Sequence, residues 1–228
     1  MTTMTADELK AELAAEYDLS EATYRIAEKP FHICSVADSY ALLDRLSPEE
    51  FAKDEQMPYW AEIWPASLIL SKFIFEELHV EGHSCIEIGA GIGVVSIAAA
   101  MAGGKVLSTD YSSEALRFIK LNALLNQVEL DVATLDWRLV TLPDKYNYLF
   151  AADVLYERRN QLPILNAIDK LLSKDGRAFI ADPRRQIAQG FVAMAAENGF
   201  TVTSKTKLLQ VPIKQLSIDI HELRRTNG

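Results

Sequence analysis

From residue 58 onward, short apolar runs alternate with stretches that repeat apolar residues at helical spacing. The apolar runs cover residues 84–88, 105–109, 130–134, 146–152 and 177–181. Two runs of alternating apolar and polar residues, 201–211 and 215–223, flank Pro212-Ile213-Lys214, a pattern typical of a β-hairpin. Strands that alternate with helices indicate a parallel sheet covered on both faces. We therefore predict a doubly wound, Rossmann-like α/β fold with a mostly parallel seven-stranded sheet and a C-terminal antiparallel hairpin.

Glycines and polar caps set the expected limits of the later helices. One helix is expected to begin at Asn160 and to stop at Gly176. Another is expected to cover residues 186–198 and to stop at Gly199. The chain therefore supplies helices for both faces of the predicted sheet.

The first 57 residues lack the regular alternation of predicted strands and helices that begins at residue 58. A polar helical stretch near residues 6–17 leads into two short strand-like runs, 22–28 and 31–36. A helical stretch at 39–46 and a charged segment at 47–55 follow. We expect residues 1–57 to form a small N-terminal cap on a single domain that spans residues 58–228.

Composition and charge narrow the class of protein. Hydrophobic residues make up 49% and charged residues 24%, values typical of a soluble globular enzyme. The formal net charge of −9 argues against a nucleic-acid partner, because phosphate binding requires clustered Lys and Arg. The same charge suits a cationic or neutral substrate, or serves solubility alone. Apolar runs shorter than the ~18 residues that span a bilayer, and an acidic N-terminus, lead us to expect a cytoplasmic protein.

The cysteines and histidines do not have the spacing of a metal site. Cys34 and Cys85 lie far apart, and the four histidines form no cluster in the sequence. We therefore expect no metal ion and no catalytic triad.

Acidic residues and glycines gather at the predicted strand ends. Four of the five parallel strands are followed by an aspartate, and the first is followed by the glycine turn 89–93, with Glu87 before it. The four aspartates are Asp110, Asp136, Asp153 and Asp182. Ligands of doubly wound sheets bind beyond the carboxyl ends of the strands. The sequence therefore predicts a ligand site at this edge.

The glycine turn fits more than one nucleotide cofactor. Its spacing is G-x-G-x-G, whereas dinucleotide sites use G-x-G-x-x-G to approach a pyrophosphate. Glu87 would repel a pyrophosphate and suits a sulfonium cofactor that carries no phosphate. Asp110 follows Gly89 by about twenty residues, the interval of an acid that holds ribose hydroxyls in either cofactor. Asp136-Trp137 offers an acceptor for the adenine amino group and an aromatic face, although core packing of Trp137 is an equal alternative.

At these residues the chain resembles the class I methyltransferases, and within them the seven-β-strand protein-lysine methyltransferases (methyltransferase family 16). The resemblance covers residues 58–199 and excludes the segment before residue 58. Members of this family act on calmodulin, chaperones and an electron-transfer flavoprotein. The matching motifs are Pro58-Tyr-Trp-Ala-Glu-Ile-Trp-Pro65, Glu87-Ile-Gly-Ala-Gly-Ile-Gly93, Thr109-Asp110, Leu135-Asp136-Trp137 and Ala152-Asp153-Val-Leu-Tyr156-Glu157. The run Ile180-Ala-Asp-Pro-Arg-Arg185 resembles a feature of bacterial relatives.

The resemblance implies S-adenosylmethionine as cofactor, with S-adenosylhomocysteine as product. It implies that the glycine turn and Glu87 hold the methionine part, that Asp110 holds the ribose, and that Asp136 and Trp137 hold the adenine with Trp64 nearby. The implied cofactor-binding residues are Trp64, Glu87, Gly89, Ala90, Gly91, Gly93, Asp110, Tyr111, Asp136, Trp137, Ala152 and Asp153.

Asp153 and Tyr156 are the implied catalytic residues. Asp153 is expected to orient an acceptor amine by hydrogen bonding, with a general-base role as the alternative, and Tyr156 is expected to shape an aromatic entrance. Other roles compete with these: Asp153 as a cap of the following turn, and Tyr156 as a core residue. Asp182-Pro183 either ends a strand or lines the acceptor side.

Three functions are compatible with these residues. The leading hypothesis is a protein-lysine N-methyltransferase that acts as a monomer on a protein acceptor. The second is a small-molecule N- or O-methyltransferase on the same fold. The third, from another class, is a non-catalytic nucleotide-binding or NAD-linked protein.

Overall fold

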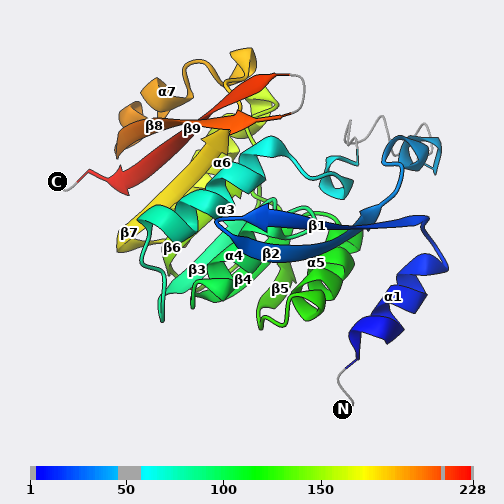
Figure 1. The fold of residues 1–228 in the computed structure, drawn as a ribbon. Helices are drawn as coiled ribbons and strands as arrows, with labels where there is room; N and C mark the ends of the chain where they lie inside the picture. The colour runs from blue at the N-terminus through cyan, green and yellow to red at the C-terminus, as the bar shows by residue number, and fades with distance from the viewer. Residues whose placement is uncertain (1–3, 46–57, 212–213, 227–228) are drawn as a thin grey trace.

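A computed structural model describes residues 4–45, 58–211 and 214–226, and Figure 1 shows its sheets and helices. The main sheet has seven strands in the order β5-β4-β3-β6-β7-β9-β8. Strands β3 to β7 are parallel, and the hairpin β8–β9 joins β7 in antiparallel pairing. The predicted mixed sheet and its terminal hairpin are confirmed. The strands are β3 (Ser84–Ile88), β4 (Lys105–Asp110), β5 (Asp131–Thr134), β6 (Tyr146–Ala152), β7 (Leu172–Asp182), β8 (Phe200–Gln210) and β9 (Gln215–Arg225).

Within the described residues, five helices pack against the two faces of this sheet. Alternate residues of β3 and β6 enter different cores, since successive strand side chains point to opposite faces. Cys85 and Phe150 pack with α3 and α4, whereas Ile86 and Leu149 pack with α6 and α7. Helix α5 shares a third core with α4. The helices are α3 (Pro65–Glu77), α4 (Val94–Met101), α5 (Ser113–Leu125), α6 (Arg158–Leu171) and α7 (Phe191–Glu197).

Three of the expected helix limits are wrong. Helix α6 begins at Arg158 with Glu157 as its N-cap, so Asn160 lies in its first turn. Helix α6 ends at Leu171, and β7 begins at Leu172, so the predicted stop at Gly176 falls inside a strand. The segment predicted as one helix over 186–198 divides into a 3-10 turn (Gln186–Ala188) and α7. Gly190, with φ of +94°, separates them and is the N-cap of α7. Apolar periodicity alone did not reveal this break, because the apolar spacing continues across the glycine.

The N-terminal segment forms helix α1 (Ala6–Ala14) and the two-stranded sheet β1 (Leu19–Ile26) and β2 (Lys29–Val36). Its apolar residues enter the core that α4 and α5 share. Asn122 of α5 accepts a hydrogen bond from the Cys34 amide (2.7 Å) and donates to the Cys34 carbonyl (3.0 Å). The same amide group donates to the Ile92 carbonyl (3.0 Å), so it joins β2 to the glycine turn. The predicted charged segment, 47–55, lies outside the described residues.

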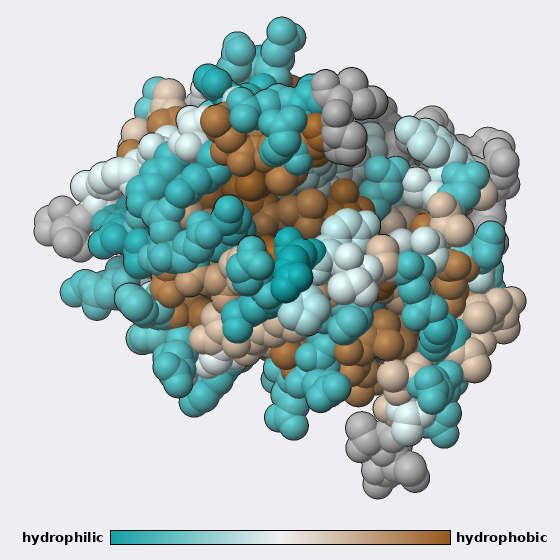
Figure 2. Space-filling view, in the orientation of Figure 1, coloured by the Kyte–Doolittle hydropathy of each residue, from teal (hydrophilic) through white to brown (hydrophobic). Residues whose placement is uncertain are grey.

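Much of the face drawn in Figure 2 is hydrophilic, with hydrophobic residues gathered in patches between the hydrophilic ones. None of the helices in the described part of the chain combines the length and the apolar character needed to cross a membrane.

Candidate functional site

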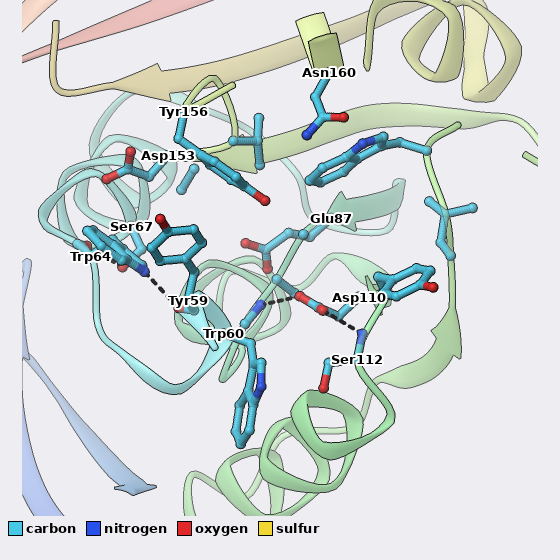
Figure 3. Close-up of a pocket in the computed structure, with 18 of the residues that line it drawn as sticks. Tyr59, Trp60, Trp64, Ser67, Glu87, Asp110, Ser112, Asp153, Tyr156 and Asn160 are labelled. Carbon is cyan, nitrogen blue, oxygen red and sulfur yellow. Dashed lines mark hydrogen bonds between the residues drawn. The ribbon is translucent and has the colours of Figure 1, made fainter. Parts of the chain in front are cut away.

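A pocket opens at the carboxyl ends of β3, β4, β5 and β6, and Figure 3 shows the side chains around it. It brings together the residues implied to bind the cofactor or to act in catalysis except Gly93, whereas Asp182, predicted at the same edge, does not line it. Those that line it are Trp64, Glu87, Gly89, Ala90, Gly91, Asp110, Tyr111, Asp136, Trp137, Ala152, Asp153 and Tyr156. Gly93 is instead the N-cap of α4, and a Cβ there would lie 3.2 Å from Ile119 Cγ1. Gly93 thus permits close packing of α5 and does not line the pocket.

Two glycines of the turn require left-handed backbone and close neighbours. Gly89 has φ of +66° and Gly91 has φ of +56°. A Cβ on Gly89 would lie 3.0 Å from Trp137 Cζ3, and a Cβ on Gly91 would lie 3.1 Å from the Trp60 carbonyl oxygen. The turn is therefore held between Trp137 on one side and the backbone of Trp60 on the other.

Glu87 is a buried acid beneath this turn. Its Oε2 accepts hydrogen bonds from the backbone amide (2.7 Å) and the hydroxyl of Ser96, in the first turn of α4. Burial raises the pKa of Glu87 to about 8, against the lowering effect of these two bonds, and the nearby charge of Asp110 adds to the rise. The carboxyl group is therefore largely neutral at pH 7 while the pocket contains no cation.

Asp110 ends β4 and is held by two backbone amides. Its Oδ2 accepts from the Gly91 amide (2.8 Å), and its Oδ1 accepts from the Ser112 amide (2.9 Å) at the start of α5. Burial raises the pKa of Asp110 to about 6, although these bonds oppose the rise. The backbone of Tyr111 also opposes the rise, and the carboxylate lines the pocket, where a carboxylate oxygen can accept from a hydroxyl group.

Asp136 and Trp137 border the pocket next to Tyr111. Asp136 Oδ1 accepts from the backbone amide (2.8 Å) and Nε (2.9 Å) of Arg138, whose guanidinium lies 5.3 Å from the Tyr111 ring centre. Burial would raise the pKa of Asp136, but the bonds and charge of Arg138 hold it below its usual value. Trp137 lines the pocket and also packs against the core of α6 and α7. Trp137 therefore packs in the core and also borders the pocket, and its contact with the adenine stays a prediction.

Asp153 marks the other end of the pocket. Its φ is +59°, and its side chain is 3% exposed. Its Oδ1 accepts a hydrogen bond from Arg185 Nε (2.6 Å). Burial raises the pKa of Asp153, while the bond and charge of Arg185 oppose the rise.

Three aromatic rings gather beside Asp153 (Figure 3). The Tyr59 ring centre lies 5.1 Å from that of Tyr156 and 5.8 Å from that of Trp64. Burial raises the pKa of Tyr156, so its phenol remains neutral. The sequence places Trp64 near the adenine, but the structure places it on the Asp153 side, away from Asp110 (Figure 3).

Two residues of this end were not singled out by the sequence. Tyr59 lies within the Pro58–Pro65 motif, and Arg185 ends the run that begins at Ile180. Both segments were noted in the sequence, but neither residue was assigned a role there. Within the described residues, no group of three or more His, Cys, Asp or Glu side chains is arranged to hold a metal ion.

Comparison with known proteins adds the following findings. Residues 50–198 match the model of a family described as lysine methyltransferase. The chain is 29% identical to protein N-lysine methyltransferase METTL21A of Mus musculus over 65% of this chain and 72% of that protein. It is 32% identical to the electron transfer flavoprotein beta subunit lysine methyltransferase of Homo sapiens, over 56% of this chain and 50% of that protein.

Solved structures with low sequence identity share the fold. A putative RNA methyltransferase from Pyrococcus horikoshii superposes with a TM-score of 0.60 at 17% identity, covering 74% of this chain and 89% of that one. A 16S rRNA methyltransferase of T. thermophilus, in complex with AdoMet and guanosine, superposes with a TM-score of 0.61 at 14% identity, covering 92% of this chain and 51% of that one.

Proposed function

This chain belongs to the lysine methyltransferase family, and from that premise we propose that it methylates the side-chain amine of a lysine in an acceptor protein. Membership makes it a methyltransferase that depends on S-adenosylmethionine. The observation that supports the acceptor most directly is the Asp153 end of the pocket, where a buried carboxylate stands beside Tyr59, Trp64 and Tyr156.

The pocket residues fit this cofactor. Glu87 can ionise when a cationic group enters, and it would then face the positive methionine part. Asp110, already held by two amides, would accept from the two ribose hydroxyls, while Asp136 and Trp137 would border the adenine. Gly89 and Gly91 leave no room for a side chain between the turn and its neighbours. We therefore assign the methionine end to β3 and α4 and the adenine end to the loop after β5.

When bound, S-adenosylmethionine would supply the methyl group: its carbon–sulfur bond would break with the electron pair staying on sulfur, the acceptor nitrogen would form the new carbon–nitrogen bond, and the proton of the nitrogen would pass to solvent. Such a displacement depends chiefly on alignment. Asp153 would accept an N–H of the amine and so direct its lone pair along the reaction axis. Tyr59, Trp64 and Tyr156 would exclude water around the amine, which lowers its pKa from the usual ~10.4 and favours the neutral nucleophile.

The decisive experiment is transfer of a labelled methyl group from S-adenosylmethionine to proteins of a cell extract, resolved on a gel. A labelled protein band, with the label on lysine after hydrolysis, is the expected result. Label only in low-mass material would indicate a small-molecule acceptor and refute the protein substrate. Calorimetry with NAD in place of S-adenosylmethionine tests the nucleotide-binding alternative, since binding of NAD alone would overturn the cofactor assignment.

Two substitutions separate the ends of the pocket. Asp110→Ala should weaken S-adenosylmethionine binding by at least ~1–3 kcal/mol, because charged hydrogen bonds to the ribose are lost. Asp153→Asn should leave that affinity unchanged and lower the turnover number. The reverse pattern in calorimetry and turnover would contradict the assignment of the two ends.

The class of acceptor, the cellular compartment and the oligomeric state of the enzyme are part of the same proposal. The formal net charge of −9 supports a protein acceptor with basic segments and disfavours nucleic acid. Cys34 and Cys85 are both free and buried, which supports a reducing compartment such as the cytoplasm. We also expect the enzyme to act as a monomer, which sedimentation at assay concentration tests.

A further inference from the structure

The turn after β7 brings a second acid and an arginine to Asp153. The end of β6 joins β7 through the hydrogen bond from the Asp153 amide to the Ala181 carbonyl (2.8 Å). The next residue, Asp182, is 2% exposed, and its Oδ1 accepts from the Arg185 amide (2.9 Å). Arg184 between them has φ of +61°. This left-handed residue turns the chain back, so that the Arg185 side chain reaches Asp153.

Arg185 is held by two different partners at the acceptor end. Its Nε donates to Asp153 Oδ1 (2.6 Å), and its guanidinium lies 5.5 Å from the centre of the Trp64 ring. The aromatic face attracts the cation while the carboxylate forms a charge-assisted hydrogen bond. The two partners belong to other segments, the end of β6 and the start of α3, and both place the guanidinium at the Asp153 end of the pocket.

Two carboxylate oxygens at this place have no partner. Asp153 Oδ2 and Asp182 Oδ2 are buried and make no hydrogen bond with any described residue. A buried acceptor without a donor is costly, and protein structures satisfy most such groups. Asp153 lines the pocket, so its unpartnered oxygen is where a ligand donor is expected.

Asp153, Asp182 and Arg185 form a cluster of two acids and one cation. Asp153 and Asp182 share one guanidinium, that of Arg185, and the tyrosine that faces Arg185 is Tyr59. Asp219 of β9 lies opposite Asp182 in the sheet but pairs with Arg184 at 3.3 Å. Burial, together with the charge of Asp153, raises the pKa of Asp182 to about 6. Removal of Arg185 would leave two buried acids without a cation.

We infer that Arg185 is a positioning residue of the acceptor site, which pins Asp153 Oδ1 and balances the two acids so that Asp153 Oδ2 receives the acceptor amine. This inference rests on the proposed function. An ionised Asp153 accepts from the amine, whereas a protonated one cannot hold it in the same way. The positive charge of Arg185 also offsets the tendency of the carboxylates to keep the amine protonated, so it favours the neutral nucleophile.

The first test requires no acceptor. Titration of the side-chain carboxyl carbons by NMR, in protein with labelled aspartate, follows Asp153, whose signal is identified by its loss in Asp153→Asn. Arg185→Gln should raise the titration midpoint of Asp153 by at least about one unit, a tenfold change in proton affinity. Arg184→Gln is the matched control, because Arg184 pairs with Asp219, and it should leave the titration midpoint of Asp153 unchanged. Asp182→Asn should lower that midpoint. An unchanged midpoint in Arg185→Gln would overturn the inference.

The second test uses the labelled protein band of the extract assay. Arg185→Gln should lower kcat/KM about tenfold or more at neutral pH, mainly through kcat, and should move the acid limb of the pH profile upward. Activity should therefore recover as the pH rises, and Arg185→Lys should restore part of it. Arg184→Gln should have the same kcat/KM and the same pH profile as the wild-type enzyme. All variants should bind S-adenosylmethionine with unchanged affinity, since Arg185 does not line the cofactor end.

The two tests distinguish a failure of the inference about Arg185 from a failure of the proposed function. An Arg185→Gln enzyme with higher turnover and lower KM would show that Arg185 blocks the acceptor place, and an unchanged pH profile would show a purely structural arginine; either result overturns the inference. Absence of any labelled protein with the unchanged enzyme would refute the proposed function, while the carboxyl titration would still decide whether Arg185 keeps Asp153 ionised. Should Arg185→Gln fail to fold, Arg185→Lys and Asp182→Asn provide the same comparison.

Discussion

Replacing Glu87 by Gln should stabilise the protein while impairing cofactor binding. The amide is nearly the same shape as the acid, and its oxygen can still accept from the amide and hydroxyl of Ser96. What the substitution removes is an ionisable group in a fully buried position. The folded protein at neutral pH keeps a proton on Glu87 that the unfolded chain releases, and this difference is the source of the expected gain.

The size of the gain follows from the pKa. Burial raises the pKa of Glu87 from 4.5 to about 8. Because the pKa of Glu87 is higher in the folded protein, its contribution to the free energy of unfolding is fully present below pH ~4.5. This contribution is lost as the pH rises towards pH ~8. At pH 7 the difference spans about two and a half units, and each unit is worth about 1.4 kcal/mol, so Glu87 lowers the free energy of unfolding by about 3 kcal/mol.

Urea unfolding of both proteins over a range of pH measures this effect. The advantage of Glu87→Gln should be small near pH 4.5, should reach about 3 kcal/mol near pH 7, and should grow by about 1 kcal/mol more towards pH 8. Comparing the two proteins at each pH cancels the contributions of the groups that do not interact with Glu87. The variant should bind S-adenosylmethionine more weakly than the unchanged protein. A stability difference that does not depend on pH would refute the reasoning about the buried proton.

The remaining predictions concern the glycine turn and the N-terminal sheet. Gly89→Ala should lower both the affinity for S-adenosylmethionine and the free energy of unfolding, the latter by about 1–3 kcal/mol, because its Cβ meets Trp137 in a left-handed conformation. Gly199→Ala, which has φ of +84° but no heavy atom within 4 Å of its Cβ, isolates the backbone part in the same calorimetry and urea unfolding. Equal losses would exclude the Trp137 contact. Asn122→Ala should cost about 2–4 kcal/mol in urea unfolding, since it leaves buried backbone groups of β2 unpaired, and Asn126→Ala, nearer the solvent, should cost less.

Local patterns were sufficient for the sheet and for most of the cofactor end. Strands such as 84–88 and 146–152 are apolar because both faces of a central parallel strand are buried, so their positions are visible in the sequence alone. The residues that follow parallel strands meet at one edge, which is why Glu87, Asp110, Asp136 and Asp153 could be assigned to one pocket before any contact was known.

Tertiary contacts decided the rest. Nothing near Arg185 in the sequence indicates that its partner is Asp153, because that pair depends on β6 and β7 lying side by side and on the left-handed turn at Arg184. Trp64 likewise lies on the Asp153 side of the pocket because α3 begins there, and Gly93 faces α5, not the pocket. The sequence by itself determined the sheet, the glycine turn and the acids at the strand ends, since these follow from local spacing. Only the tertiary structure decided which charge balances which acid, because buried ion pairs join residues that the chain keeps far apart.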